Sequence, residues 1–378
     1  MGNKRIHGGE KNNNINGYDF SISLNALGMP MDARRAAISY IENDPAYPSV
    51  NCEELTDAIS SFYSVPATYL ALGNGATELI YAFAHLISLK MKRYKALCIS
   101  PGFTEYYYGV QASGNLVNHF ILRRKEYSET QSVSYSPSKE EKSRILSQIK
   151  SDTGIVFICN PNNPTGELWD KKFLLELLDK CEKSGTYLFI DECFIDFTSQ
   201  ANSMREYLSK SPNLVVLGAA TKIFSMAGLR LGYLLCGDNK LVDDLKEILP
   251  SWNVSGVAQS AGTVAYRNKD FVTTTVLFYS KEREYMIEEL KKLGLKVCDN
   301  SKANFLMFES PTELREKLLQ EKIIIRECSD MFYREGSLKD DSFSYRENFY
   351  TYRIGIKKRE ENDYLLEKIK WILTAEQK

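Results

Sequence analysis

The chain has 378 residues, which is long enough for one large domain and one smaller domain. Its hydrophobic fraction of 43% and charged fraction of 26% are ordinary for a globular protein. The formal net charge of −1 argues against a nucleic-acid partner, and the absence of a long apolar run argues against a transmembrane helix.

Short apolar runs alternate with amphipathic stretches along most of the chain. This rhythm predicts an α/β fold with a mostly parallel sheet covered by helices on both faces. A short strand is also expected at 19–25, and the polar segment 125–142 is expected to be a surface excursion. The expected strands of the main sheet are 70–72, 96–100, 116–122, 154–159, 187–190, 214–218 and 231–236, and the expected helices are 30–41, 53–63, 77–88, one after Pro101, and 171–184.

A long helix over about 270–293 is expected to lead into a smaller α+β domain. Residues 1–30 should join that domain, which makes it discontinuous. The predicted division is therefore 31–270 for the large domain, and 1–30 with 271–378 for the small one. The smaller domain is expected to hold strands at 304–308, 323–326 and 350–356 and a final helix at 360–373.

Eight cysteines are scattered singly, without a CxxC pair, and the chain has three histidines. This pattern predicts no metal site. Several of the cysteines lie in apolar runs, which is typical of reduced, buried thiols. We therefore expect a cytoplasmic protein.

Lys222 is the centre of the functional pattern. It comes just after the expected strand 214–218, where an open α/β sheet places its ligand crevice. A partly desolvated lysine in that place can lose its proton and form an imine with an aldehyde cofactor. Arg230 follows with a fork suited to a phosphate. A single lysine after a strand is more often a surface residue, but three other stretches predict the same chemistry.

Two of these stretches follow neighbouring strands. Asn163 lies in the turn-rich sequence 160–166, where its amide can either satisfy local backbone groups or face a ligand. Asp191 follows the strand 187–190 and can be a helix cap or a surface charge. Beside a pyridine cofactor, it would instead bind the ring nitrogen and keep it protonated, which makes the ring an electron sink.

The third stretch, 73–78, is a glycine turn that enters a helix, and its free N–H groups suit a phosphate. Phe103 and Tyr106 can offer an aromatic face to a flat ring or can be ordinary core residues. Arg353 lies inside the expected strand 350–356. A buried arginine needs a partner, which is either a substrate carboxylate or an internal Asp or Glu.

Along the chain, the phosphate turn, the aromatic residues, Asn163, Asp191, Lys222, Arg230 and Arg353 follow one another in an order that resembles the class I/II aminotransferases of fold type I, which use pyridoxal 5′-phosphate (PLP). The resemblance covers essentially the whole chain and implies a large PLP-binding domain. Within the family, the chain resembles the histidinol-phosphate aminotransferase branch and especially threonine-phosphate decarboxylase. The residues that carry this likeness are His7-Gly8-Gly9, Asp19-Phe20-Ser21, Tyr47-Pro48, and the segments 101–106 and 323–328.

The resemblance implies a role for each residue of the cofactor site. Lys222 would form the Schiff base and shuttle protons, Asp191 would pair with the pyridine nitrogen, and Asn163 would bind the phenolic oxygen. Phe103 is favoured as the residue that stacks on the ring, with Tyr106 as the alternative. The phosphate would be held by Gly75, Ala76, Thr77 and Arg230.

The resemblance also implies a homodimer, because Tyr47 would reach the cofactor phosphate of the other subunit. Arg353 would bind the substrate α-carboxylate, and Asn25 would line the same pocket. Candidate ligands for a substrate phosphate, which can equally be solvated charges, are His7, Arg326 and Lys357.

Three departures from the family pattern stand out. Ala219 replaces a serine that usually binds the cofactor phosphate, and Ala26 replaces the proline of the usual Asn-Pro, which is expected to loosen the substrate loop. Phe194 replaces a tyrosine whose hydroxyl supports the phenolic oxygen in most aminotransferases. The decarboxylase has phenylalanine there.

Two reactions are therefore expected. The first is transamination of a small, phosphorylated amino acid or amine with glutamate and 2-oxoglutarate, and the alternative is decarboxylation of O-phospho-L-threonine or O-phospho-L-serine. The placement of the substrate carboxylate decides between them, and the sequence does not resolve it. A PLP-binding regulator is a third alternative, disfavoured because the catalytic fold is entered by about Asp19 without a DNA-binding domain.

Overall fold

The apolar runs assemble into a seven-stranded sheet. The computed structural model describes residues 8–9, 17–44, 46–332 and 349–375. Four of the six strand pairs in this sheet are parallel, and β10 is antiparallel to both of its neighbours. The predicted α/β fold is therefore confirmed. In spatial order the strands are β2 (Leu70–Asn74), β10 (Leu231–Cys236), β9 (Leu214–Ala219), β8 (Tyr187–Asp191), β7 (Thr153–Cys159), β3 (Lys95–Ser100) and β4 (Leu116–Ile121).

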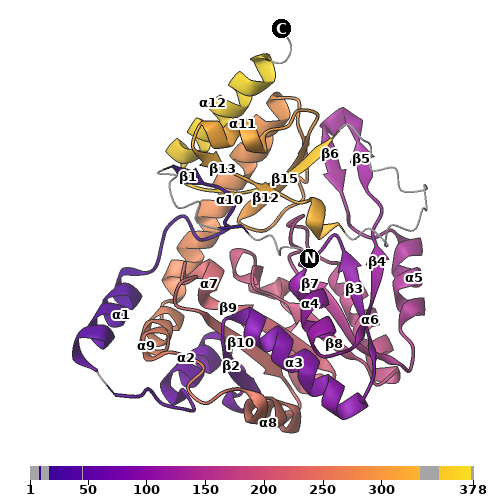
Figure 1. Ribbon diagram of the computed structural model, residues 1–378, viewed down its shortest axis with the longest axis vertical. Coiled ribbons are helices and arrows are strands. Elements are labelled where there is room, and N and C mark those ends of the chain that lie inside the picture. Colours follow the sequence, from indigo (N-terminus) through magenta and orange to yellow (C-terminus); the bar gives the residue numbers. More distant parts are fainter. Residues whose placement is uncertain (1–7, 10–16, 45, 333–348, 376–378) are drawn as a thin grey trace.

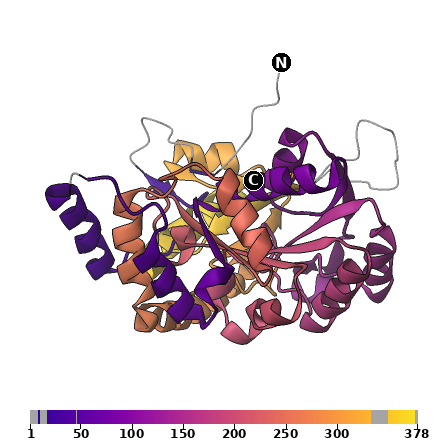
Figure 2. The same ribbon diagram turned by 90° about the horizontal axis from the view of Figure 1, so that it is seen from below.

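Both faces of this sheet are buried beneath helices (Figures 1 and 2). Along β7, Val156 and Ile158 join one hydrophobic core, whereas Ile155, Phe157 and Cys159 join the other. Successive side chains of a strand point to opposite faces, so a strand covered on both faces is apolar throughout. This explains why the sequence shows continuous apolar runs here.

The helices expected at 30–41, 53–63, 77–88, 171–184, 270–293 and 360–373 are present, and each begins and ends within three residues of its expected bounds. Helix α2 has the expected bounds, and the long helix α10 extends from the seven-stranded sheet to the second sheet (Figure 1). The α-helices are α1 (Met31–Asn43), α2 (Glu53–Tyr63), α3 (Ala76–Met91), α4 (Glu105–Ala112), α5 (Lys139–Gln148), α6 (Lys171–Lys183), α7 (Ala220–Ile223), α8 (Asn239–Ile248), α9 (Gly256–Tyr266), α10 (Lys269–Lys292), α11 (Arg315–Gln320) and α12 (Arg359–Ala375).

A second sheet of six strands corrects one expectation. The polar segment 125–142 is not merely a surface excursion, because β5 and β6 form a hairpin whose β6 pairs with β11. The serines of β6 are buried and hydrogen-bonded, so the strand lacks the apolar signal that would have predicted it. In order the strands are β14 (Arg326–Glu327), β15 (Tyr350–Gly355), β12 (Phe305–Ser310), β11 (Lys296–Val297), β6 (Ser132–Ser134) and β5 (Lys125–Tyr127).

Two other expected strands are shorter than predicted. The expected strand 19–25 is limited to β1 (Tyr18–Asp19), because the Asp19 carboxylate accepts hydrogen bonds from the backbone and hydroxyl of Ser21 and turns the chain. The expected strand 323–326 is split. Its first part, β13 (Ile323–Ile324), pairs with β1, and β14 pairs with β15 in the second sheet.

The two-domain division stays a proposal. Its small part, 271–378 with the N-terminal residues, contains most of the six-stranded sheet, and β1 pairs with β13 as that division requires. The β5–β6 hairpin contributes to the same sheet from within 31–270. Among the described residues, no helix is long and apolar enough to cross a membrane.

Packing between β9 and β10 provides a test of the core. A Cβ on Gly218 would lie 2.2 Å from the ring of Tyr233, which is fully buried. We expect Gly218→Ala to lower the free energy of unfolding by about 1–3 kcal/mol, because the ring has no space to move into. Denaturant unfolding measures this change. Gly228→Ala is the control, since nothing lies within 4 Å of its added methyl group; equal losses in the two variants would contradict the packing argument.

Candidate active site

The predicted catalytic residues meet at the carboxyl end of two parallel strands. Asp191 is the last residue of β8, and Lys222 lies in α7, the short helix that follows β9. Since β8 and β9 are hydrogen-bonded neighbours, the two side chains belong to the same edge of the sheet. The ring of Phe194 lies beside them, with its centroid 5.8 Å from Lys222 Nζ.

Lys222 is held in a low-polarity, positively charged environment. Burial lowers the pKa of its ammonium group from the ordinary 10.5 to about 8, and the guanidinium groups of Arg353 and Arg230 act in the same direction. Desolvation and nearby positive charge both disfavour the protonated amine. A substantial fraction of the lysine is therefore neutral near physiological pH, as a nucleophilic amine must be.

Asn25 holds the backbone that carries this lysine. Its N–H donates to the Lys222 carbonyl oxygen at 3.1 Å, and its side-chain amide donates to Ile223 O at 2.7 Å and Thr275 Oγ1 at 3.0 Å. The amide is buried, and both of its N–H groups are used in these bonds. The contacts support a role in fixing α7, while the substrate-lining role of Asn25 stays a prediction.

Ala26 has a use that the family's proline would not have. Its backbone N–H donates to the hydroxyl of Tyr279 at 2.7 Å. Proline has no N–H and cannot make this bond. The loop was expected to be loosened by the loss of proline, yet it is fastened to α10 by this different contact.

The two aromatic candidates are placed differently. The Tyr106 hydroxyl donates to Asp191 Oδ2 at 2.7 Å, and its ring is stacked on Phe157 with a centroid distance of 5.0 Å and an interplanar angle of 8°. One face of Tyr106 is therefore covered. Phe103 is only partly buried and meets the Tyr106 ring edge-on at 5.6 Å. Tyr106 therefore has a contact of its own with Asp191, and Phe103 stays the predicted stacking residue.

The predicted phosphate site forms a cup between α3 and β10. Gly75 has a φ of +81° at the start of α3, and that helix has no side-chain cap, so its first N–H groups stay available to a ligand. A Cβ on Gly75 would lie 2.4 Å from Arg230 Nη2, and one on Gly232 would lie 2.5 Å from the N atom of Ala76. Glycine thus lets the cation and the helix amides, including that of Thr77, come together, which fits a phosphate.

Ala219 lies next to this cup, and its effect on phosphate binding stays a prediction. It ends β9 directly opposite Gly232 and is 4% exposed. Its methyl group cannot donate the hydrogen bond that a serine hydroxyl would supply. Binding of a phosphate here therefore depends on the α3 amides and on Arg230.

Arg353 is a buried cation that faces the other side of the site. It donates hydrogen bonds to Asn163 Oδ1 and, at 2.9 Å, to Ser21 O. Its Nε atom is buried and has no partner, and no acidic side chain among the described residues forms an ion pair with it. Burial lowers the pKa of the Arg353 guanidinium below its ordinary range. A buried guanidinium in this state is suited to a carboxylate ligand.

The predicted ligands for a substrate phosphate are less favourably placed. Arg326 lies opposite Arg353 in the register of β14 and β15, and its Nη2 donates to both carboxylate oxygens of Asp330 at 2.7 and 2.6 Å. A phosphate would have to compete with that carboxylate. The Nζ atom of Lys357 lies 3.7 Å from Oε1 of Glu361, with which it forms an ion pair. His7 lies outside the described residues.

Tyr47 lies at the surface. It is 83% exposed, and its ring packs on that of Trp252 with a centroid distance of 5.0 Å. Trp252 is also exposed and donates to Pro48 O at 3.1 Å. The predicted contact of Tyr47 with the other subunit stays a prediction.

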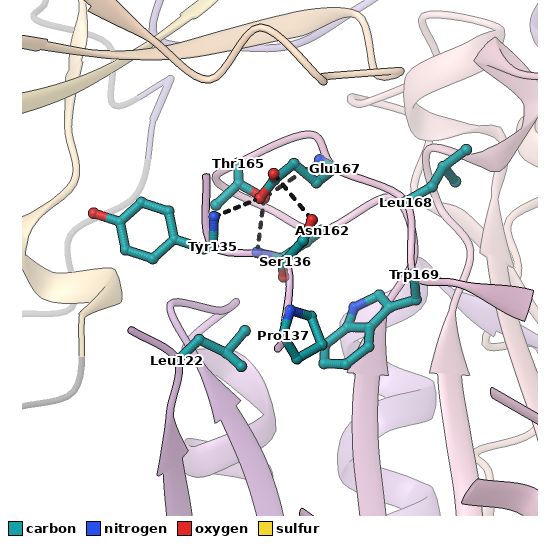
Figure 3. A pocket seen from close by; sticks show the side chains of 9 residues that line it. All are labelled: Leu122, Tyr135, Ser136, Pro137, Asn162, Thr165, Glu167, Leu168 and Trp169. Carbon is teal, nitrogen blue, oxygen red and sulfur yellow. Dashed lines mark hydrogen bonds between the residues drawn. The ribbon is translucent and has the colours of Figure 1, made fainter. Parts of the chain in front are cut away.

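Glu167 is a residue of the site region that the sequence analysis missed. It accepts hydrogen bonds from the N–H of Tyr135 and the hydroxyl of Ser136 (Figure 3). The hydroxyl of Ser134, in β6, donates to the same carboxylate. These bonds fasten the loop that carries Asn163 to the second sheet. A carboxylate flanked by Gly166 and the apolar pair 168–169 is the signal that could have identified it.

The same loop also contacts the connection between β11 and β12. The Gly166 carbonyl oxygen accepts a hydrogen bond from Lys302 N at 2.8 Å. Gly166 has a φ of +74°, and its Cβ would lie 2.0 Å from Ser301 Oγ. Arg353 therefore contacts Asn163 directly, whereas Gly166 and Glu167 hold the loop that carries it.

The lowered pKa of Lys222 predicts a pH profile. In cofactor-free protein, the rate constant for capture of PLP should rise with pH through about 8 and then level off, because only the neutral amine attacks the aldehyde. Stopped-flow absorbance measures it. Arg353→Met removes a positive charge and should move the midpoint to higher pH. A profile that rises only near the ordinary value of 10.5 would contradict the assignment.

The cup around Gly75 predicts a loss of cofactor affinity. Gly75→Ala should weaken PLP binding by about tenfold or more, because its methyl group would displace the Arg230 guanidinium from the phosphate position. Equilibrium titration of the cofactor-free protein measures the Kd. Gly114→Ala is the matched control, with a similar φ of +77° and nothing within 4 Å. Unchanged affinity in Gly75→Ala would disprove the phosphate assignment.

Comparison with known proteins identifies the family. A family model described as aminotransferase class I and II matches residues 16–369. The threonine-phosphate decarboxylase of Salmonella typhimurium is 30% identical over 360 residues, covering 94% of this chain and 91% of that protein. The histidinol-phosphate aminotransferase of Ruminiclostridium cellulolyticum is 28% identical over 326 residues, covering 84% and 86%.

A solved structure agrees with this result. The histidinol-phosphate aminotransferase from Clostridium acetobutylicum has a TM-score of 0.80 and 29% identity, and the match covers 95% of this chain and 99% of that one. Because the family model spans nearly the whole chain and the solved fold matches, the chain belongs to the class I and II aminotransferase family, enzymes of α/β fold type I that use pyridoxal 5′-phosphate.

Proposed function

We propose that this enzyme decarboxylates a small α-amino acid that carries a phosphate group. The choice of an α-amino acid as the substrate class rests on Arg353. This residue is buried without an acidic partner among the described residues, and its Nε is unpaired. An α-carboxylate is an anion that such a guanidinium can bind. The charge of Arg353 lowers the pKa of Lys222, which supports placing the carboxylate in the same site as the amine.

Each residue of the candidate site would have a distinct role in the reaction. When bound, the cofactor supplies an electron sink for the pair left on Cα. Arg353 would orient the substrate carboxylate, and Asn163 would help to hold both Arg353 and the cofactor. Because its pKa of about 8 leaves much of Lys222 protonated near physiological pH, its ammonium form would supply the proton that replaces CO2 on Cα. Asp191 would keep the ring nitrogen protonated.

The observation that carries the choice of decarboxylation is Phe194. It lies over Lys222, buried and edge-on to Phe305 at 4.9 Å. Most aminotransferases of the family that the chain resembles have a tyrosine there, and the decarboxylase has a phenylalanine. The match to the threonine-phosphate decarboxylase of Salmonella typhimurium along 94% of the chain supports the same choice.

Transamination is the second candidate. It is supported by the similarity to histidinol-phosphate aminotransferases, both in sequence and in fold. A lysine with a lowered pKa can move a proton in either reaction, so Lys222 does not discriminate between them. Glutamate and 2-oxoglutarate would then be the partner substrates, and a small phosphorylated amino acid or amine would be the other.

We also propose that the enzyme is a homodimer in which each subunit supplies Tyr47 to the other's phosphate cup. The proposal rests on the exposed aromatic pair of Tyr47 and Trp252, since aromatic residues are enriched at subunit interfaces. The cytoplasmic location stays a prediction.

The reaction is tested by supplying PLP-loaded protein separately with O-phospho-L-threonine, O-phospho-L-serine and L-glutamate. We expect one of the two phosphoamino acids to release CO2 and the matching phosphorylated amine over many turnovers, without a keto acid. Conversion of glutamate to 2-oxoglutarate, with the cofactor left in its amine form, would establish transamination instead. If none of the three reacts, both proposals fail.

Arg353→Lys tests the substrate contact in the same assay. Lysine keeps the charge but loses the planar fork, so KM for the amino acid should rise by about tenfold or more. Arg359→Lys is the control, because Arg359 is exposed and its guanidinium is already paired with both carboxylate oxygens of Glu282 in α10. An unchanged KM in Arg353→Lys would remove the α-carboxylate from this site.

A further inference from the structure

Asp191 has one protein donor on each oxygen of its carboxylate. The Tyr106 hydroxyl donates to Oδ2 at 2.7 Å, and the Cys193 backbone N–H donates to Oδ1 at 2.9 Å. No cationic side chain among the described residues forms an ion pair with Asp191. The Cys193 thiol also lies within hydrogen-bonding reach, but a thiol is a weak donor. The phenol is therefore the strong side-chain donor to this buried carboxylate.

Tyr106 is held so that its hydroxyl cannot turn away. The side chain is 3% exposed, its ring is stacked on Phe157 at 5.0 Å, and Phe103 meets its edge at 5.6 Å. The hydroxyl also stays protonated, because burial and the negative charge of Asp191 raise the pKa of Tyr106 well above its ordinary value. The phenol is thus a fixed donor throughout the working pH range.

We propose that Tyr106 is a positioning residue that holds Asp191 as an oriented anion and so keeps the proton on the cofactor ring nitrogen. A hydrogen bond to the ionised carboxylate stabilises that form over the protonated one. Where the carboxylate faces a pyridine nitrogen, the bond therefore favours the charge-separated pair over the neutral pair. The inference rests on the family's cofactor and on the proposed role of Asp191, and it holds for either reaction.

The ring-nitrogen proton can be observed directly. Tyr106→Phe keeps the stacked ring and removes only the donor, so the enzyme loaded with ¹⁵N-labelled PLP should show a ring-nitrogen resonance displaced from the wild-type position toward the unprotonated form. Tyr63→Phe is the matched control, because the Tyr63 hydroxyl makes a bond of the same length, 2.7 Å, to Asp196. That variant should keep the wild-type resonance. A wild-type resonance in Tyr106→Phe would overturn the proposal.

A double-mutant cycle separates positioning from general stability. Tyr106→Phe should weaken PLP binding by about tenfold in the wild-type background and much less in the D191N background, where no carboxylate anion is left to stabilise. Equal losses in both backgrounds would mean that Tyr106 acts only through packing. Neither readout needs turnover. A D191N enzyme with a wild-type ring-nitrogen resonance would instead show that the assigned partner of the nitrogen is wrong.

Discussion

Desolvation of Lys222 is the condition on which the site depends. The lysine lies where two buried parallel strands end, and the low polarity of that place brings its pKa to about 8. The surrounding structure maintains this state, because Asn25 donates to the carbonyl oxygens of Lys222 and Ile223, and the positive charge of Arg353 opposes reprotonation. A lysine on a freely solvated turn would remain charged at the same pH.

Much of this arrangement could be predicted because it follows from short, local sequence patterns. Continuous apolar runs identify strands that are buried on both faces, and polar residues directly after such runs lie at one edge of the sheet. Lys222, Asp191 and Asn163 were found in this way. The glycine turn at 73–78 was likewise expected to enter a helix, and Gly75 directly precedes α3.

The rest depends on contacts between distant segments, which leave little trace in a single sequence. The β5–β6 hairpin is polar, and its buried Ser132 and Ser134 donate hydrogen bonds to Asp299 and Glu167, carboxylates that are distant in the sequence. The bond from Tyr106 to Asp191 joins residues that are 85 positions apart. From the sequence alone, a tyrosine such as Tyr106 can either stack on a ligand ring or donate a hydrogen bond through its hydroxyl. The packing of its ring on Phe157 distinguishes these two roles.

The bond between Ala26 and Tyr279 has a consequence for how this sequence can change. The two residues are 253 positions apart, yet the donor of one is fitted to the acceptor of the other. Introducing the family's usual proline at position 26 would remove the N–H while leaving the buried hydroxyl in place. The Tyr279 hydroxyl would still lie 3.4 Å from Leu24 O and 3.5 Å from Ile356 O, so the exchange would cost the bond from the loop and would not leave the hydroxyl without a partner. The residue at position 26 therefore determines whether the loop is bonded to Tyr279 of α10.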